Sequence, residues 1–182
     1  QWFDGVVTVD PHLHRVSSMD EVVPGRRGVA LSAAALLGEW AAQHADHPVL
    51  LGPDEEAAQW VGAAAQARGL DHAVCRKLRH GDHDVTVALP DMNLQGREVV
   101  LIDDVASTGH TLIAAAQAAL AQGARAVDVA VTHALFVGDA MARLHAAGVR
   151  HVWSTDTVPH ASNAVSVVPL IAAAVAQGWL AQ

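Results

Sequence analysis

Cysteine, basic residues and long apolar stretches are all scarce in this sequence of 182 residues. Cys75 is the single cysteine, which excludes an internal disulfide bond and fits a reducing, cytoplasmic compartment. No apolar stretch reaches the roughly 18 residues that a membrane-spanning helix needs, which excludes a transmembrane protein. Lysines and arginines number 11 against 19 acidic residues, and the formal net charge of −8 disfavours nucleic acid as a partner. The chain starts with glutamine rather than methionine, and we expect it to be part of a longer protein.

Apolar residues make up 52% of the chain and charged residues 16%, a composition that supports one substantial domain with a buried core. Runs of β-branched residues alternate with alanine-rich stretches of helical period. This alternation is typical of βαβ units and predicts an α/β fold with a mostly parallel sheet flanked by helices. The pattern predicts strands at 6–9, 49–51, 99–102, 127–132 and 150–153, and helices near 33–41, 57–65, 112–120, 139–146 and 167–175.

The segment 73–89 departs from this pattern and predicts an antiparallel hairpin that projects from the sheet. Apolar residues occupy every second position from 85 to 89, and Gly81 lies in a polar turn. The segment also holds Lys77, the only lysine, within a run of three basic residues at 76–79. Such a run is either a solvated surface or a set of cations placed for an anionic substrate. The scarcity of basic residues elsewhere favours the second interpretation.

The stretch 99–112 is the most informative part of the sequence. An apolar strand leads into two acids, Asp103 and Asp104, then into a turn of small residues and a helix. Ligands of open α/β sheets bind at the carboxyl ends of strands, and the unpaired N–H groups of a helix N-terminus suit a phosphate. The acids instead suit sugar hydroxyls or a divalent cation. The alternative is a helix capped by Ser107 or Thr108, with solvated acids. No Walker sequence is present, so the turn is not a P-loop.

This stretch resembles the phosphoribosyl-diphosphate (PRPP) loop of type I phosphoribosyltransferases, in which a hydrophobic strand, two acids and a Ser/Thr-Thr-Gly-x-Thr turn follow one another. Other segments resemble the ribose-phosphate diphosphokinase family, also called PRPP synthetases; they are 8–12, 51–55, 76–79, 131–136 and 154–159. That family transfers the diphosphoryl group of ATP to the C1 hydroxyl of ribose 5-phosphate, giving PRPP and AMP. The resemblance implies a phosphoribosyltransferase-type fold, with the hairpin as a flexible catalytic loop.

The resemblance implies roles for residues in the hairpin and in the turn. Lys77 and Arg79 match loop residues that close over ATP, and they are expected to stabilise the charge on the transferred group. Asp104 is expected to act as a supporting acid beside the sugar. The residues expected to bind ribose 5-phosphate are Asp103, Asp104, Ser107, Thr108, Gly109, His110 and Thr111.

A magnesium site is expected from three further residues. The resemblance assigns Asp10 and His12 to a family metal motif in which Pro11 replaces the usual leucine. An extended backbone would place both side chains on one face together with His14, to which the family gives no role. Asp54 follows a predicted strand, so it should lie at the same sheet edge as Asp103. The resemblance matches Asp54 to a family acid beside the ribose-phosphate site that contributes to binding Mg²⁺. A surface strand end with incidental histidines is the alternative.

The resemblance covers the end of a first phosphoribosyltransferase-like half and all of a second. We therefore expect 1–28 to end the first half, 29–165 to bind ribose 5-phosphate, and 166–182 to form a terminal helix that packs on the missing half. The intact protein is expected to be a homo-oligomer, and the chain alone to bind ribose 5-phosphate with little or no turnover. The alternatives are a salvage phosphoribosyltransferase that uses PRPP, a non-catalytic regulatory protein that associates with PRPP synthetases, and a generic sugar-phosphate-binding domain.

Overall fold

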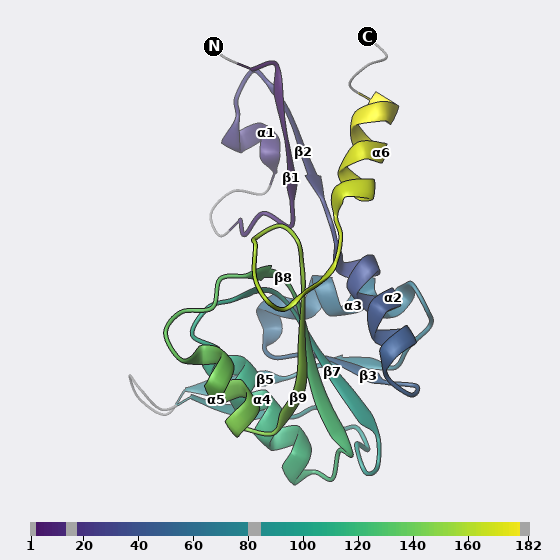
Figure 1. Ribbon diagram of the computed structural model, residues 1–182, viewed down its shortest axis with the longest axis vertical. Helices are drawn as coiled ribbons and strands as arrows, with labels where there is room; N and C mark the ends of the chain where they lie inside the picture. The colour runs from purple at the N-terminus through teal and green to yellow at the C-terminus, as the bar shows by residue number, and fades with distance from the viewer. Residues whose placement is uncertain (1–2, 14–17, 80–84, 179–182) are drawn as a thin grey trace.

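A parallel β-sheet forms the centre of the computed structural model, which describes residues 3–13, 18–79 and 85–178 (Figure 1). Six of the described strands pair in the order β10-β9-β8-β7-β3-β4, and every neighbouring pair is parallel. The order confirms the predicted α/β fold; the two edge strands were not among the predicted elements. The bounds are β3 (Val49–Gly52), β4 (His72–Val74), β7 (Glu98–Ala106), β8 (Ala126–Ala134), β9 (Val149–Thr155) and β10 (Asn163–Val165).

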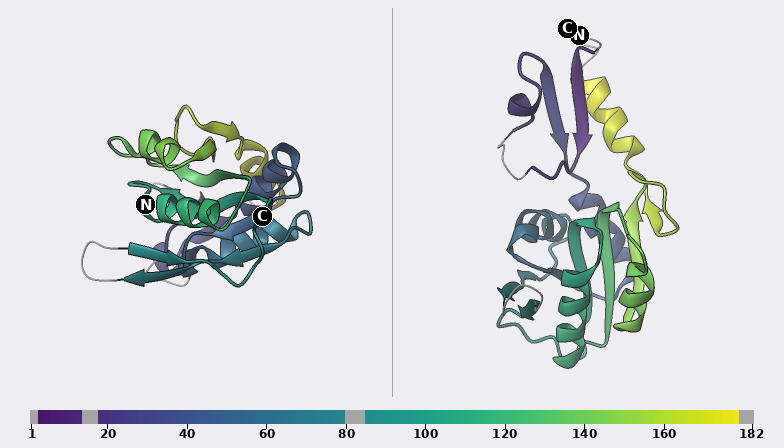
Figure 2. Two further views of the ribbon diagram at one scale, coloured as in Figure 1. Left: turned by 90° about the horizontal axis from the view of Figure 1, so that it is seen from below. Right: turned by 90° about the vertical axis from the view of Figure 1, so that its left-hand side faces the viewer.

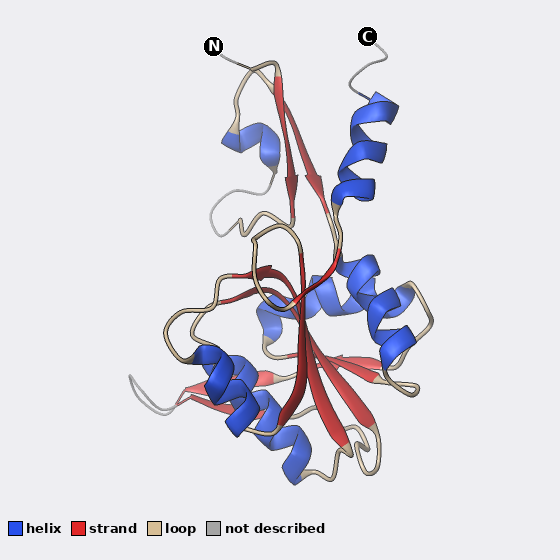
Figure 3. Cartoon of the chain, in the orientation of Figure 1, coloured by secondary structure: helices blue, strands red, loops and turns tan. Residues whose placement is uncertain are grey.

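The central strands are apolar on both faces and need a helical layer on each side. In β7, Val99 and Leu101 pack into one core, while Val100 and Ile102 pack into another, and all four are fully buried. The helices of the first layer are α4 (His110–Ala121) and α5 (Ala140–Ala146), and those of the second are α2 (Ala34–His44) and α3 (Ala58–Gln66) (Figure 3).

The second layer is tight because α2 carries a glycine where it crosses α3. A Cβ atom at Gly38 would lie 2.0 Å from the carbonyl oxygen of Ala64, so no larger residue fits without moving one of the helices. This close contact fixes α3 against the sheet. The site depends on it, because Trp60 of α3 is one of the residues that reach the functional edge of the sheet.

Two pieces extend from one end of the main sheet (Figures 1 and 2). One is a parallel pair formed by β1 (Gly5–Val9) and β2 (Arg27–Leu31), with the short helix α1 (Met19–Val22) between them in the chain. The other is α6 (Val168–Gly178). The boundary expected at residue 28 falls inside β2, a strand that the sequence pattern did not indicate. Among the described helices, none combines the length and apolar character that crossing a bilayer requires.

The predicted hairpin is shorter than the segment 73–89. β5 (Arg76–Arg79) and β6 (Val85–Ala88) pair antiparallel, and the residues that join them lie outside the described part of the chain. The preceding residues form β4, which pairs parallel with β3. The backbone N–H of Cys75 still donates to the carbonyl of Gly52 at 2.9 Å, so the chain follows the edge of β3 until it turns into β5.

Candidate functional site

The two acids of the site lie inside β7, which is longer than predicted and includes residues that the sequence pattern assigned to the turn. Successive side chains of a strand point to opposite faces of the sheet. Asp103 shares the face of Leu101 and lines a cavity of about 180 Å³ together with residues 107–111. Asp104 shares the face of Ile102 and is only 3% exposed. The two acids therefore serve different sides of the sheet.

Asp103 lies in an environment that disfavours its charge. Burial, followed by the negative charges of Asp104 and Asp54, raises the pKa of Asp103 to about 8. The backbone N–H of Asp104 donates to the Asp103 carboxylate at 3.0 Å and opposes only part of this effect. A carboxyl group with this pKa is mostly protonated at neutral pH, so it can donate a hydrogen bond to a hydroxyl as well as accept one.

Asp54 lies at the carboxyl edge of the sheet, just beyond β3. Its carboxylate accepts the backbone N–H of Glu56 at 3.1 Å and so caps the short 3₁₀-helix η1 (Glu55–Ala57). β3 pairs in parallel with β7, and the Asp54 charge contributes to the raised pKa of Asp103. The structure therefore brings Asp54 and Asp103 to one edge, as the sequence predicts.

The turn 107–111 joins β7 to α4 and has the geometry of an anion site. Gly109 directly precedes the helix with a φ of 72°, a left-handed conformation that glycine adopts without strain. No described side chain caps α4, so the alternative capping role of Ser107 or Thr108 is wrong; both side chains are exposed. The N–H groups of the first helical turn, including that of Thr111, are left for a ligand at the positive end of the helix dipole.

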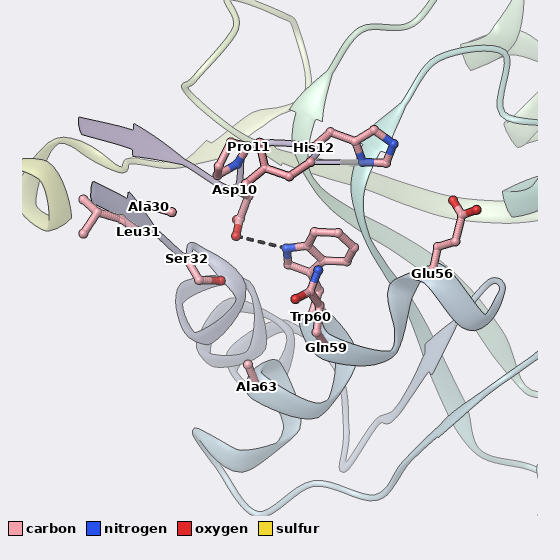
Figure 4. Close-up of a pocket in the computed structure, with 11 residues that line it drawn as sticks. Asp10, Pro11, His12, Ala30, Leu31, Ser32, Glu56, Gln59, Trp60 and Ala63 are labelled. Atoms are coloured by element: carbon pink, nitrogen blue, oxygen red, sulfur yellow. Dashed lines mark hydrogen bonds between the residues drawn. The ribbon is translucent and has the colours of Figure 1, made fainter. Parts of the chain in front are cut away.

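Asp10 accepts four hydrogen bonds from three described parts of the fold, and Figure 4 shows the one from Trp60. Its carboxylate accepts the Ala33 backbone N–H at 2.9 Å, the Trp60 indole N–H at 3.0 Å and the Thr132 hydroxyl at 2.8 Å. Its carbonyl oxygen accepts from Nε2 of His133 at 3.1 Å. Asp10 is 4% exposed. A carboxylate engaged in this way joins β1 to α2, α3 and β8, and the metal-binding role expected for Asp10 stays a prediction.

The predicted metal face with Asp10 and His12 does not form. Asp10 has a φ of 40°, in the left-handed region, so the backbone is not extended and the period of two breaks here. The two side chains point away from each other (Figure 4). His12 instead donates from Nδ1 to Oδ2 of Asp104 at 2.5 Å. His14 lies outside the described residues.

A second, larger cavity opens beside His12, between the β1–β2 pair and α3 (Figure 4). Its volume is about 740 Å³, within the range of small-molecule sites. Its lining includes His12, Ser32, Glu56, Gln59 and Trp60. The His12–Asp104 hydrogen bond connects the wall of this cavity to β7, and hence to the strand that carries Asp103.

The residues at this edge fit a magnesium ion that is only partly coordinated by protein. Within the described ranges, no three His, Cys, Asp or Glu side chains converge on a complete metal site. Mg²⁺ commonly takes one or two carboxylates and completes its shell with water and substrate phosphates. Asp54 supplies such an oxygen donor, and the like charges that raise the pKa of Asp103 indicate an edge where a cation would be favourable.

The catalytic residues expected in the hairpin are placed only as backbone. Lys77 and Arg79 belong to β5 and pair with Val87 and Val85 of β6, and their side chains lie outside what the structure describes. Their roles therefore stay predictions.

Sequence reasoning missed several residues that complete the site. Trp60 and Thr132 hold Asp10, and Arg143 of α5 lies with Nη1 3.1 Å from Nε2 of His110 in the turn. Thr132 had one usable signal, its place near the carboxyl end of a strand adjacent to β7. Arg143 had none, because it lies 33 residues beyond its partner in the sequence.

The phosphoribosyl transferase domain family matches residues 30–169, a range that runs from β2 to α6 and includes the turn between β7 and α4. The chain belongs to this family. The match agrees with the resemblance of the turn to a PRPP loop, and the parallel sheet with helices on both faces is the phosphoribosyltransferase-type fold.

Individual relatives of this phosphoribosyltransferase-family chain carry a more specific name. It is 38% identical over 147 residues to a ribose-phosphate pyrophosphokinase of Methanosarcina acetivorans, covering 80% of this chain and 52% of that one. It is 36% identical over 175 residues to a ribose-phosphate pyrophosphokinase of Methanopyrus kandleri, covering 94% and 58%. A crystal structure of phosphoribosylpyrophosphate synthetase from Mycobacterium smegmatis has the same fold, with a TM-score of 0.75 and 24% identity over 95% of this chain and 58% of that one. The chain thus spans somewhat more than half of each of these proteins.

Proposed function

We propose that this chain is the ribose 5-phosphate-binding part of a ribose-phosphate diphosphokinase. In the proposed reaction the C1 hydroxyl oxygen of ribose 5-phosphate forms a bond to the β-phosphorus of ATP. The bond between that phosphorus and the oxygen bridging to the α-phosphate breaks, AMP leaves with this oxygen, and the C1 hydroxyl proton passes to solvent. The observation that carries the proposal is the pairing of an acid with a phosphate-type turn, Asp103 with residues 107–111, around one cavity. The names of the curated relatives point to the same reaction.

The turn and Asp103 would bind different parts of the sugar phosphate. The N–H groups and hydroxyls of Ser107, Thr108, Gly109, His110 and Thr111 would bind the phosphate at the positive end of α4. Asp103, which lines the same cavity, would exchange hydrogen bonds with the ribose hydroxyls. Asp104 faces the opposite side of β7 and binds His12, so its supporting role would be to fix that histidine beside the larger cavity.

We further propose that Mg²⁺ is bound by Asp54, with His12 acting through water, and that Asp10 is not a ligand. When bound, the cation supplies positive charge that offsets the phosphates of ATP. Asp10 contributes indirectly, because its hydrogen bonds set the direction of the chain that leads to His12. Lys77 and Arg79 remain the proposed cations for the transferred group, where a fixed cation contributes roughly 2–4 kcal/mol of transition-state stabilisation.

The activity of the whole protein is part of the proposal, because the chain spans 52 to 58% of the relatives described above. We propose that 29–165 is the sugar-phosphate domain, that 1–28 is the end of a first, N-terminal half, and that 166–182 packs on that half. The apolar face of α6 supports this division. It begins at Val168, which is 63% exposed, and it continues along the helix through Ile171 and Val175. The intact protein is proposed to act as a cytoplasmic homo-oligomer.

The test is an assay of the full-length parent protein with ribose 5-phosphate and Mg-ATP, in which AMP release is measured. We expect AMP and PRPP in equal amounts. Base-dependent consumption of PRPP without AMP release would instead identify a salvage phosphoribosyltransferase. Lys77→Ala should lower kcat at least about thirtyfold and leave ribose 5-phosphate affinity within about twofold, because the lysine is assigned to the transferred group. Arg76→Ala in the same strand is the matched control and should keep near-normal kcat.

A further inference from the structure

An arginine from another helix contacts the phosphate-type turn 107–111, and no sequence pattern predicts this contact. Nη1 of Arg143, in α5, lies 3.1 Å from Nε2 of His110, the first residue of α4. A guanidinium can only donate hydrogen bonds, so the imidazole nitrogen that faces it must accept. His110 is therefore neutral in this arrangement, with its proton on Nδ1. The positive charge at this corner of the turn belongs to Arg143.

The contact is supported by the packing of the following loop and helix against the turn. The backbone N–H of Val137 donates to the carbonyl of Ser107 at 3.3 Å, which attaches the loop after β8 to the turn. Leu144 is fully buried, and a Cβ atom at Gly109 would lie 3.6 Å from its Cγ. α5 thus lies directly against the turn, and Arg143 precedes the leucine that makes this contact.

Arg143 has no acidic partner among the described residues. Among the described residues, Arg97, Arg125 and Arg150 each form ion pairs with carboxylates. No carboxylate in the described ranges lies within ion-pair distance of Arg143, whose side chain contacts the ring of His110. A guanidinium has five N–H donors, so four remain after the bond to histidine. A half-exposed arginine of this kind can bind an anion without first breaking an ion pair.

We propose that Arg143 is a phosphate-binding residue of the turn 107–111, with His110 as a neutral second donor through Nδ1. The inference rests on the proposed function and extends it from the backbone of the turn to a side chain on another helix. Its physical basis is charge: the cavity beside the turn is bordered by Asp103, and a phosphate dianion placed there needs a cation. Arg143 does not line the cavity itself, but it contacts His110, which does, so its guanidinium supplies that charge from beside the cavity.

The test is calorimetric titration of the chain with ribose 5-phosphate, with inorganic phosphate as a second probe. Arg143→Gln should weaken binding of both by about tenfold to a hundredfold, the loss expected for a hydrogen bond to a charged group. Arg68→Gln removes the same charge from an exposed site elsewhere and should change affinity less than twofold. Equal affinity in the parent and Arg143→Gln chains, with both folded by circular dichroism, would overturn the inference and leave the proposed function intact.

A double-mutant cycle with His110→Gly distinguishes two roles of Arg143: binding the phosphate directly, or only holding the ring of His110 in position. If Arg143 contacts the phosphate, Arg143→Gln should cost at least about tenfold in the His110→Gly background as well. If the cost disappears in that background, Arg143 acts only through the ring and the inference is wrong. A parent chain that binds inorganic phosphate but not ribose 5-phosphate would contradict the proposed function, while the phosphate titrations would still decide the role of Arg143.

Discussion

Asp10 provides the sharpest test of the structural argument, because the sequence predicts a metal ligand and the structure places a buried acceptor there. Oδ2 of Asp10 accepts from Ala33 N and Thr132 Oγ1, and Oδ1 accepts from Trp60 Nε1. In Asp10→Asn, the amide oxygen should take the Oδ2 position and keep two acceptor bonds. Its NH₂ group then faces the indole N–H of Trp60, which loses its partner.

The magnitude follows from these contacts. A buried donor without a partner costs about 1–3 kcal/mol, and the two remaining bonds weaken because they lose a charged acceptor. Removing a buried charge returns part of this cost, so Asp10→Asn should lower the free energy of unfolding by about 2 kcal/mol. Asp10→Ala leaves all three donors unpaired and puts alanine at a φ of 40°, so the loss should be about 4 kcal/mol or more.

Urea unfolding followed by circular dichroism measures these losses as shifts in the midpoint at constant slope. Thr132→Val is the matched control, because it removes the donor of the Thr132–Asp10 hydrogen bond. In a double-mutant cycle, the coupling free energy between Thr132→Val and Asp10→Asn should be about 1 kcal/mol or more. The magnesium affinity of folded Asp10→Asn, measured in the full-length protein, should stay within about twofold of the parent. Unchanged stability together with a large loss of magnesium affinity would refute the structural role and restore the metal role.

Two further predictions concern the other buried carboxylates. The pKa of Asp103 is raised to about 8, mainly by burial, so the folded state holds this proton more tightly than the unfolded state. The contribution of this proton to the free energy of unfolding is full below about pH 4 and is lost as the pH rises to about 8. Asp103→Asn should flatten that decline when the free energy of unfolding is measured from pH 4 to 9. An unchanged slope would show that Asp103 does not titrate in this range. Asp128, at the opposite edge of the sheet, is 0% exposed and binds Arg150 at 2.5 Å. Arg150→Met removes the donor to Oδ2 of this buried carboxylate and leaves, among the described residues, only the His151 donors to Oδ1, so it should cost about 3–5 kcal/mol. Adding Asp128→Asn should recover part of the loss; no recovery would point to lost packing instead.

The elements with a strong local pattern were predictable. β7, α4 and β8 follow from runs of buried residues with a clear period, and the order of acid, small residues and helix in 103–111 predicted the turn between β7 and α4. These features depend on contacts between close neighbours in the chain. The edge strands β4 and β10 have three residues each, too few for a periodic signal, and they form because β3 and β9 offer backbone partners.

The sequence by itself determined the fold class, the strand–turn–helix at the end of β7 and the shared sheet edge of Asp54 and Asp103, because these features depend on local patterns of apolar, small and acidic residues. Only the tertiary structure decided the hydrogen-bond partners of Asp10, since a single left-handed residue turned its carboxylate inward to donors from three distant segments. It also decided which acid faces which cavity, and it brought Arg143 to His110. Hydrogen bonds of this kind depend on how helices pack on the sheet, and no spacing along the chain encodes them.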